Sequence, residues 1–284
     1  TDGGFISAST SGQGNAGKMT INASEIELFG TNKNGISTKL SVQVNPQATG
    51  DAGSLIINTE TLNILNGAKI SANTFGNGDA GIIDINADKL NIRGNGSEIS
   101  ATTFSQGIGG NIFVFADEFW ASQGGQIRTT TSSSEKAGNI TLNIKDNLAL
   151  TGEETGIFAN TTEESTGNGG SIIIDPEVVN IFDGARISVD SQGEGIGGDI
   201  QLAAGNLNLD NGGITAETRS DTGGDITLNI QDLLLLRNNS QISTTAGNEQ
   251  FGGDGGSINI NTPDGFIVAF PNEDSNISAN AFEG

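Results

Sequence analysis

Short runs in which apolar and polar residues alternate fill most of the chain, and glycine-rich segments separate them. Every second residue is apolar in the run Ile83-Asp84-Ile85-Asn86-Ala87, and two further runs, residues 90–92 and 99–103, follow the same pattern. A period of two residues is typical of β-strands with one buried face. Helical spacing at i, i+3 and i+4 is not sustained anywhere, so the pattern predicts an all-β protein.

The runs recur as an internal repeat that opens with a small residue and a glycine. Successive second glycines are 36, 28, 29, 28, 32, 28, 26 and 32 residues apart. Three short strands in a unit of about 28 residues fit one coil of a solenoid, whereas a β-propeller blade needs four strands and a longer repeat. We therefore predict a right-handed parallel β-helix of about nine to ten coils, its hand following the general preference of parallel crossovers. The repeats start at Ala16-Gly17, Ala52-Gly53, Ala80-Gly81, Gly109-Gly110, Ala137-Gly138, Gly169-Gly170, Gly197-Gly198, Gly223-Gly224 and Gly255-Gly256.

When the coils are aligned, residues of the same chemical type fall at equivalent positions. Ile and Leu dominate the inward positions of the first two runs, so stacked aliphatic rows are expected to form the core. Two polar rows are expected to be ladders between coils rather than a ligand-binding lattice, because stacked identical side chains can hydrogen-bond along the axis. The third run begins with Ile6, Ile36, Ile70, Ile99, Ile127, Ile157, Ile187, Ile214, Ile242 and Ile277; the polar rows are Asn22, Asn58, Asn86, Asn143, Asn229 and Asn261, and Thr74, Thr103, Thr131, Thr161 and Thr218.

Several segments resemble a known family. Residues 3–10 (GGFISAST) and 79–87 (DAGIIDINA) resemble repeats of filamentous-hemagglutinin-like exoproteins, and residues 265–271 (GFIVAFP) with 276–284 (NISANAFEG) are similar to a segment of the cyanobacterial members. The resemblance implies two-partner secretion, residence outside the cell or at its surface, and a role in adhesion or in a matrix. We expect residues 1–284 to be one β-helix domain, a fragment of the repeat shaft of a longer protein.

Composition narrows the range of chemistry. The chain has 34 acidic and 12 basic residues, a net charge of −22, and neither Cys, His nor Tyr. Such a charge repels nucleic acids and anionic lipids, and no apolar stretch is long enough to span a bilayer. Disulfides, thiolate zinc sites and the commonest general base are excluded. Gly-Asp steps recur, but the 28-residue period does not fit a nonapeptide calcium repeat. We expect no cofactor, no metal site, no nucleic-acid partner and no membrane insertion.

An enzyme is the main alternative, because a β-helix can also be a polysaccharide lyase or a glycosidase. Such an enzyme needs two or three carboxylates that converge in one groove. The candidates on neighbouring coils are interpreted as a solvated acidic edge, and the chain as a non-catalytic structural or adhesive shaft segment. These candidates are Glu153, Glu154, Glu163, Glu164, Asp183, Asp190 and Glu194, with Arg186 beside them.

One coil carries three large aromatic residues at positions that point outward. Strand alternation directs Phe113, Phe115 and Trp120 to the surface and the residues between them, such as Phe119, to the core. Such a patch often marks a contact site, here for a protein or glycan partner, for side-by-side packing of shafts, or for a covering loop or domain. Trp120 lies past an expected bend, so the sequence is compatible with two small patches as well as with one. Open sheet edges at the two ends also predict end-to-end self-association.

Overall fold

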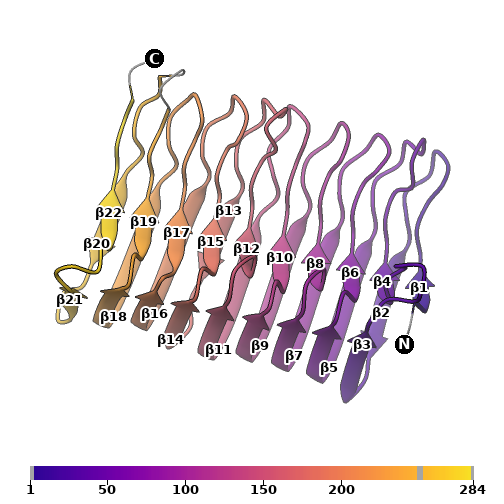
Figure 1. The fold of residues 1–284 in the computed structure, drawn as a ribbon. Helices are drawn as coiled ribbons and strands as arrows, with labels where there is room; N and C mark the ends of the chain where they lie inside the picture. Colours follow the sequence, from indigo (N-terminus) through magenta and orange to yellow (C-terminus); the bar gives the residue numbers. More distant parts are fainter. Residues whose placement is uncertain (1–2, 248–251, 283–284) are drawn as a thin grey trace.

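A computed structural model describes residues 3–247 and 252–282, and every regular element in this part of the chain is a β-strand. The strands wind into a right-handed parallel β-helix of about eight turns, so the fold class is as predicted and the number of coils roughly so. Figure 1 shows the coils side by side along a rod, with the two chain ends at opposite ends of it. Strands of one coil pair with those of the next, so the ladder hydrogen bonds run along the rod axis.

Two parallel sheets form the walls of the rod. The short sheet has ten three-residue strands, and the long sheet has twelve strands, six of which are 12 residues long. The short sheet comprises β1 (Phe5–Ser7), β4 (Lys39–Ser41), β6 (Lys69–Ser71), β8 (Glu98–Ser100), β10 (Gln126–Arg128), β12 (Gly156–Phe158), β15 (Arg186–Ser188), β17 (Gly213–Thr215), β19 (Gln241–Ser243) and β22 (Asn276–Ser278). The long sheet comprises β2 (Lys18–Asn22), β3 (Glu25–Phe29), β5 (Ser54–Leu65), β7 (Ile82–Arg93), β9 (Asn111–Ser122), β11 (Ile140–Thr151), β13 (Ser171–Ile174), β14 (Val178–Phe182), β16 (Asp199–Asp210), β18 (Ile226–Arg237), β20 (Ile258–Asn261) and β21 (Phe266–Ala269).

The first two runs of each unit, expected as separate short strands, are joined in six coils. In β7 the inward alternation ends at Ala87 and resumes at Leu90, with two exposed residues between them, so each long strand has two halves whose inward faces are offset. The runs stay separate in three coils: at Ala23-Ser24 between β2 and β3, and at the prolines Pro176 between β13 and β14 and Pro263 between β20 and β21. Proline lacks the N–H that a continuing ladder needs.

The predicted core rows are present, with one error. Buried Ile, Leu and Val side chains stack from coil to coil, and most are fully inaccessible. Ile36 does not belong to the third row: it is 50 % exposed, and Leu40 pairs with Ile6 and Ile70 in its place. The first interval of the repeat is long because residues 30–38 make an extra turn, in which the Asn32 side chain accepts the amide hydrogens of Asn34 and Ile36.

The polar rows stack as aligned, but their hydrogen bonds differ from the prediction. The threonine row forms a series of single parallel bridges along the third side of the rod. Its hydroxyls mostly bond within a coil: Thr74 Oγ1 donates to the Asp79 carbonyl at 2.7 Å, and Thr103 Oγ1 to the Ile108 carbonyl at 2.8 Å. In the asparagine row Asn58 donates to Asn22 across the coils at 2.7 Å. Phe115 interrupts that row further along.

The glycine that opens each coil is required by a close approach of the backbone. A Cβ built on Gly138 would overlap the carbonyl oxygen of Gly110 in the preceding coil, and a Cβ on Gly110 would overlap that of Gly81. The same overlap recurs at each coil start from Gly53 to Gly256. We call these residues the glycine row. Its close contacts explain why the repeat signature is a glycine rather than any small residue.

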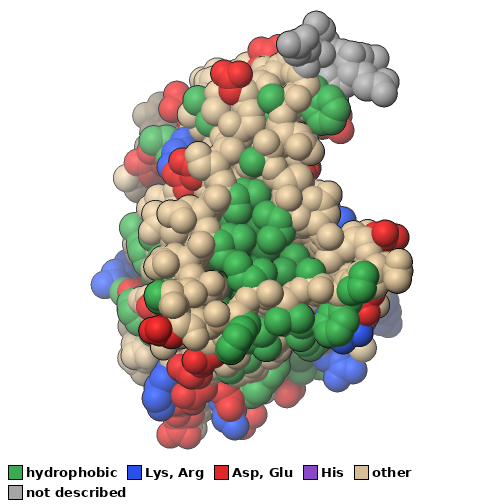
Figure 2. Space-filling model, turned by 90° about the vertical axis from the view of Figure 1, so that its left-hand side faces the viewer, with side chains coloured by type: hydrophobic (Ala, Val, Ile, Leu, Met, Phe, Trp, Pro, Cys, Tyr) green, Lys and Arg blue, Asp and Glu red, His purple; other side chains and the backbone are tan. Residues whose placement is uncertain are grey.

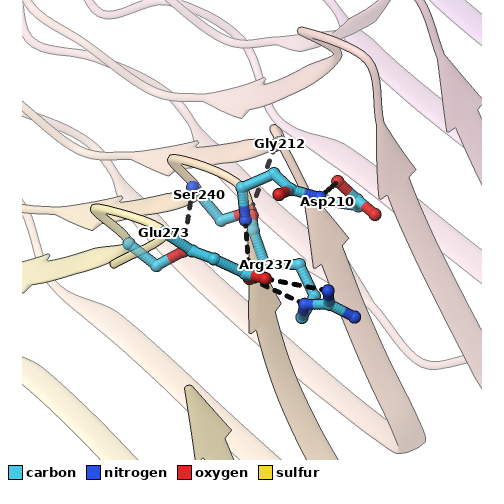
Figure 3. A network of polar contacts seen from close by, with 7 residues as sticks. Asp210, Gly212, Arg237, Ser240 and Glu273 are labelled. Atoms are coloured by element: carbon cyan, nitrogen blue, oxygen red, sulfur yellow. Dashed lines mark hydrogen bonds and ion pairs between the residues drawn. The ribbon is translucent and has the colours of Figure 1, made fainter. Parts of the chain in front are cut away.

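The last coil is fastened by a network around Glu273 (Figure 3). Arg237 at the end of β18 donates Nε and Nη2 to the Glu273 carboxylate at 2.7 and 2.8 Å, and its guanidinium lies over the Phe270 ring. The hydrogen bonds from Arg237 lower the pKa of Glu273. None of the described residues covers the end of the rod beyond this coil: apolar side chains fill the centre of the end-on view in Figure 2, and Phe266 is 72 % exposed.

Candidate functional site

The three aromatic residues lie on β9 in the predicted register. Phe113, Phe115 and Trp120 pair with Asp84, Asn86 and Asn91 of the preceding coil, as the sequence alignment expects. Phe115 is 46 % exposed and the other two are half-buried, whereas the inward Phe119 is inaccessible. The alternation slips at residues 117–118, so Trp120 lies on the other half of the strand from Phe113 and Phe115. The arrangement gives two small outward patches. Their role in binding stays a prediction.

A second surface lies on the outer face of the short sheet. A cavity of about 500 Å³ is lined by Glu163, Asp190, Gln192, Glu217 and Arg219, among others. A neighbouring hollow of about 230 Å³ is lined by Arg128, Thr130, Phe158, Asn160, Thr162 and again Gln192. We call the two together the short-sheet groove. The short strands face the viewer in Figure 1, and that side lies on the right of Figure 2, where the outline of the molecule is indented.

A backbone requirement sets the residue types along this groove. The chain bends after each short strand, and in five coils the amide hydrogen of the third residue after the central Ile or Leu is bonded to a side chain of the preceding coil. Asn73 Oδ1 accepts the Thr102 amide at 2.8 Å, Asn160 Oδ1 accepts that of Asp190 at 2.9 Å, and Asp190 Oδ1 accepts that of Glu217 at 2.8 Å. A buried amide left unpaired is costly, so this position favours a side chain with an acceptor.

Asp190 is held by hydrogen bonds on both carboxylate oxygens. Its Oδ1 accepts the Glu217 amide, while Oδ2 accepts the hydroxyls of Ser188 at 2.7 Å and Thr215 at 3.0 Å. Burial raises the pKa of Asp190, and these hydrogen bonds together with the charge of Arg186 oppose that rise. Both oxygens are therefore engaged in holding adjacent coils together.

Glu217 lies one coil further along the same face. Its Oε1 accepts the hydroxyl of Ser243 and the amide of Gln241, the latter at 3.3 Å. Burial raises the pKa of Glu217 and the charge of Asp190 raises it further, whereas the bond from Ser243 and the charge of Arg186 lower it. Two carboxyl groups with raised pKa values thus lie on adjacent coils of one cavity.

Some residues of the short-sheet groove were among the acidic candidates that the sequence suggested. Glu163 and Asp190 line the cavity, and Arg186 lies close enough to lower both raised pKa values. The other acidic candidates lie outside its lining: Glu153, Glu154, Glu164, Asp183 and Glu194. Glu217 was missed, although the alignment holds a signal for it, since it follows Ile214 by three residues as Asp190 follows Ile187. Phe158 was not predicted, because its role depends on the space that Gly156 leaves for its ring.

The described part of the chain contains neither a cluster of metal-ligand side chains nor a membrane-spanning helix. Within residues 3–247 and 252–282, no three Asp, Glu, His or Cys side chains are grouped to hold a metal ion. The same residues include no helix long and apolar enough to cross a membrane. No protein-family model, curated protein or solved structure matches the chain.

Proposed function

We propose that this chain is a non-catalytic structural or adhesive shaft segment of a secreted or cell-surface exoprotein. The observation that carries the proposal is the uninterrupted stacking of core and ladders from one end of the described rod to the other. Ten short strands with nine spacings of about 4.8 Å give a rod of about 43 Å. Such a solenoid holds whatever is attached at its ends at a fixed separation. The resemblance of residues 3–10 and 79–87 to filamentous-hemagglutinin-like repeats supports the location outside the cell.

The adhesive part of the proposal concerns Phe113, Phe115 and Trp120, which we propose as contact residues for a protein or glycan partner. One exposed and two half-buried aromatic side chains on the outward face of a single strand favour this role. Retention of purified protein on surfaces coated with matrix proteins or polysaccharides tests it, with the double variant Phe113→Ser, Trp120→Ser as comparison. Equal retention of the two proteins, both folded by circular dichroism, would refute a role for this surface.

A carbohydrate-active enzyme is the second candidate, and the two carboxyls in one cavity favour it. The raised pKa of Glu217 suits a general acid. Against it, Asp190 has both oxygens occupied by hydrogen bonds that hold the coils, so it is poorly placed as a nucleophile or base. This engagement supports the non-catalytic proposal.

A cleavage screen separates the two candidates. Neutral and acidic polysaccharides are incubated with the protein, and new reducing ends and unsaturated products are measured. The shaft proposal expects no turnover above background. Turnover that is lost in Glu217→Gln, a variant of nearly equal shape, would overturn the proposal and assign catalysis to the short-sheet groove.

A further inference from the structure

Beyond the patches on β9, we infer that the short-sheet groove binds a neutral polysaccharide strand laid along the rod axis. The inference deepens the proposed adhesive role and rests on it. Three features carry it: an aromatic platform in the lining of the groove, a stacked aromatic pair further along the row that borders it, and a lining of amides, hydroxyls and carboxyls.

The platform is Phe158, the last residue of β12. Its position in the strand is taken by Arg128 in the preceding coil and Ser188 in the next. A Cβ on Gly156 would lie 2.6 Å from Phe158 Cζ and 3.0 Å from Cε2, so the ring lies back over a residue that has no side chain. The ring is half-buried and lines the hollow together with Asn160 and Gln192. A flat apolar surface beside groups that fix orientation is the usual composition of a small-molecule site.

The aromatic pair lies in the row that borders the groove. Phe75, Phe104, Thr162, Gln192 and Arg219 each follow directly a residue of the single-bridge row. The rings of Phe75 and Phe104 stack with their centroids 4.7 Å apart and their planes within 3°, and they are 38 % and 44 % exposed. Ser132 separates the two rings from Thr162 and Gln192 in this row, so the rings extend the row beyond the lining of the groove. From the coil of Phe75 to that of Glu217 the row covers five coil spacings, about 24 Å, enough for several linked sugars.

The lining specifies an uncharged ligand rich in hydroxyl groups. The faces of a pyranose ring carry C–H groups that can cover an aromatic ring, and its edge carries hydroxyls that exchange hydrogen bonds with amides and carboxyls. The acidic groups of the cavity, Glu163, Asp190 and Glu217, together with the net charge of −22, disfavour a polyanion. Two arginines line the groove: Arg128 is paired with Glu98 at 3.5 Å, and Arg219 is outnumbered by the three acidic groups of its cavity.

Affinity electrophoresis of the whole chain in gels that contain one polysaccharide each tests the inference. The probes are hydroxyethyl cellulose, xyloglucan, mannan and dextran, with alginate as the anionic comparison. We expect at least one neutral polymer to retard the protein and alginate to leave it unaffected. Phe158→Ser should weaken the binding about tenfold, the loss of one aromatic contact, and Gln192→Ala should weaken it as well. Phe29→Ser, which changes an exposed phenylalanine of β3 on the long sheet, is the matched control and should bind like the unchanged chain. Phe115→Ser is measured beside it and reports separately on the patches of β9.

Each outcome has a separate meaning. No retardation by any of the four neutral polymers, or equal retardation of the Phe158→Ser protein with its circular dichroism unchanged, would overturn the inference. Should Phe158→Ser fail to fold, Phe104→Ser supplies the same comparison from an exposed position. Retardation that is lost only in Phe115→Ser would assign the binding to β9. That result would refute binding in the short-sheet groove and leave the proposed adhesive role standing. Depolymerisation of the gel polymer would instead overturn the non-catalytic function itself.

Discussion

The opposite placement of two phenylalanines on β9 yields a quantitative prediction. Phe119 is fully inaccessible and stacks between Leu90 and Leu148 of the adjacent coils, whereas Phe115 is 46 % exposed. Phe119→Ala is expected to lower the free energy of unfolding by about 3–5 kcal/mol, the range for truncating buried aromatic residues. The upper part of that range is expected, because the neighbouring inward residue is the small Ala121 and the coils on both sides are fixed by ladder bonds.

The control and the readout come from the same strand. Phe115→Ala is expected to cost less than about 1 kcal/mol, as for surface substitutions. Urea unfolding followed by fluorescence of Trp120, the only tryptophan of the chain, reports directly on β9. Hydrogen exchange in β7, β9 and β11 then shows whether the loss spreads to adjacent coils, as expected for a solenoid with nearest-neighbour coupling. Equal destabilisation by the two substitutions would refute the register on which the outward placement of Phe113, Phe115 and Trp120 rests.

Three further predictions follow from the same geometry. The pKa of Asp190 is raised in the folded state, so the associated stability is full below the unfolded pKa, about 4, and is lost as the pH rises through the folded pKa. Asp190→Asn keeps the acceptor for the Glu217 amide and should lessen this fall in melting temperature as the pH is raised. Gly138→Ala should prevent folding or lower the melting temperature severely, with Gly14→Ala, which meets open space, as its silent counterpart. In sedimentation velocity the chain should associate with increasing concentration, and Ile267→Lys at the uncovered end should reduce association; a monomer at every concentration would contradict it.

The sequence was informative wherever neighbouring residues alone decide the structure. Alternation of apolar and polar residues predicted the strands, and the recurrent glycine predicted how the coils align, because both reflect a requirement repeated in every coil. Ile36 was misassigned because an inserted turn ahead of Leu40 shifts the pattern without changing its composition. The joining of two runs into one strand depends on the backbone between them, which alternation does not describe.

The short-sheet groove was harder to predict than the core. Asp190 and Glu217 are 27 residues apart, and each is an unremarkable acidic residue in its own segment. Their proximity emerges only when the third position after the central isoleucine is followed through all the coils. Phe158 becomes a platform only because Gly156, two residues earlier, leaves room for its ring. A surface site on a solenoid depends on which residues of different coils come together. The core depends only on the alternation of apolar and polar residues that every coil repeats.

The direction of the ladder bonds determines how the rod responds to mechanical load. Because the hydrogen bonds of both sheets run along the axis, tension applied through the chain termini acts first on the outermost coil and reaches the next only when that coil has peeled away. Each peeled coil of about 28 residues releases about 90 Å of extended chain in place of one coil spacing. A solenoid of this kind yields in steps under tension, so it lengthens and dissipates work before the whole rod is lost.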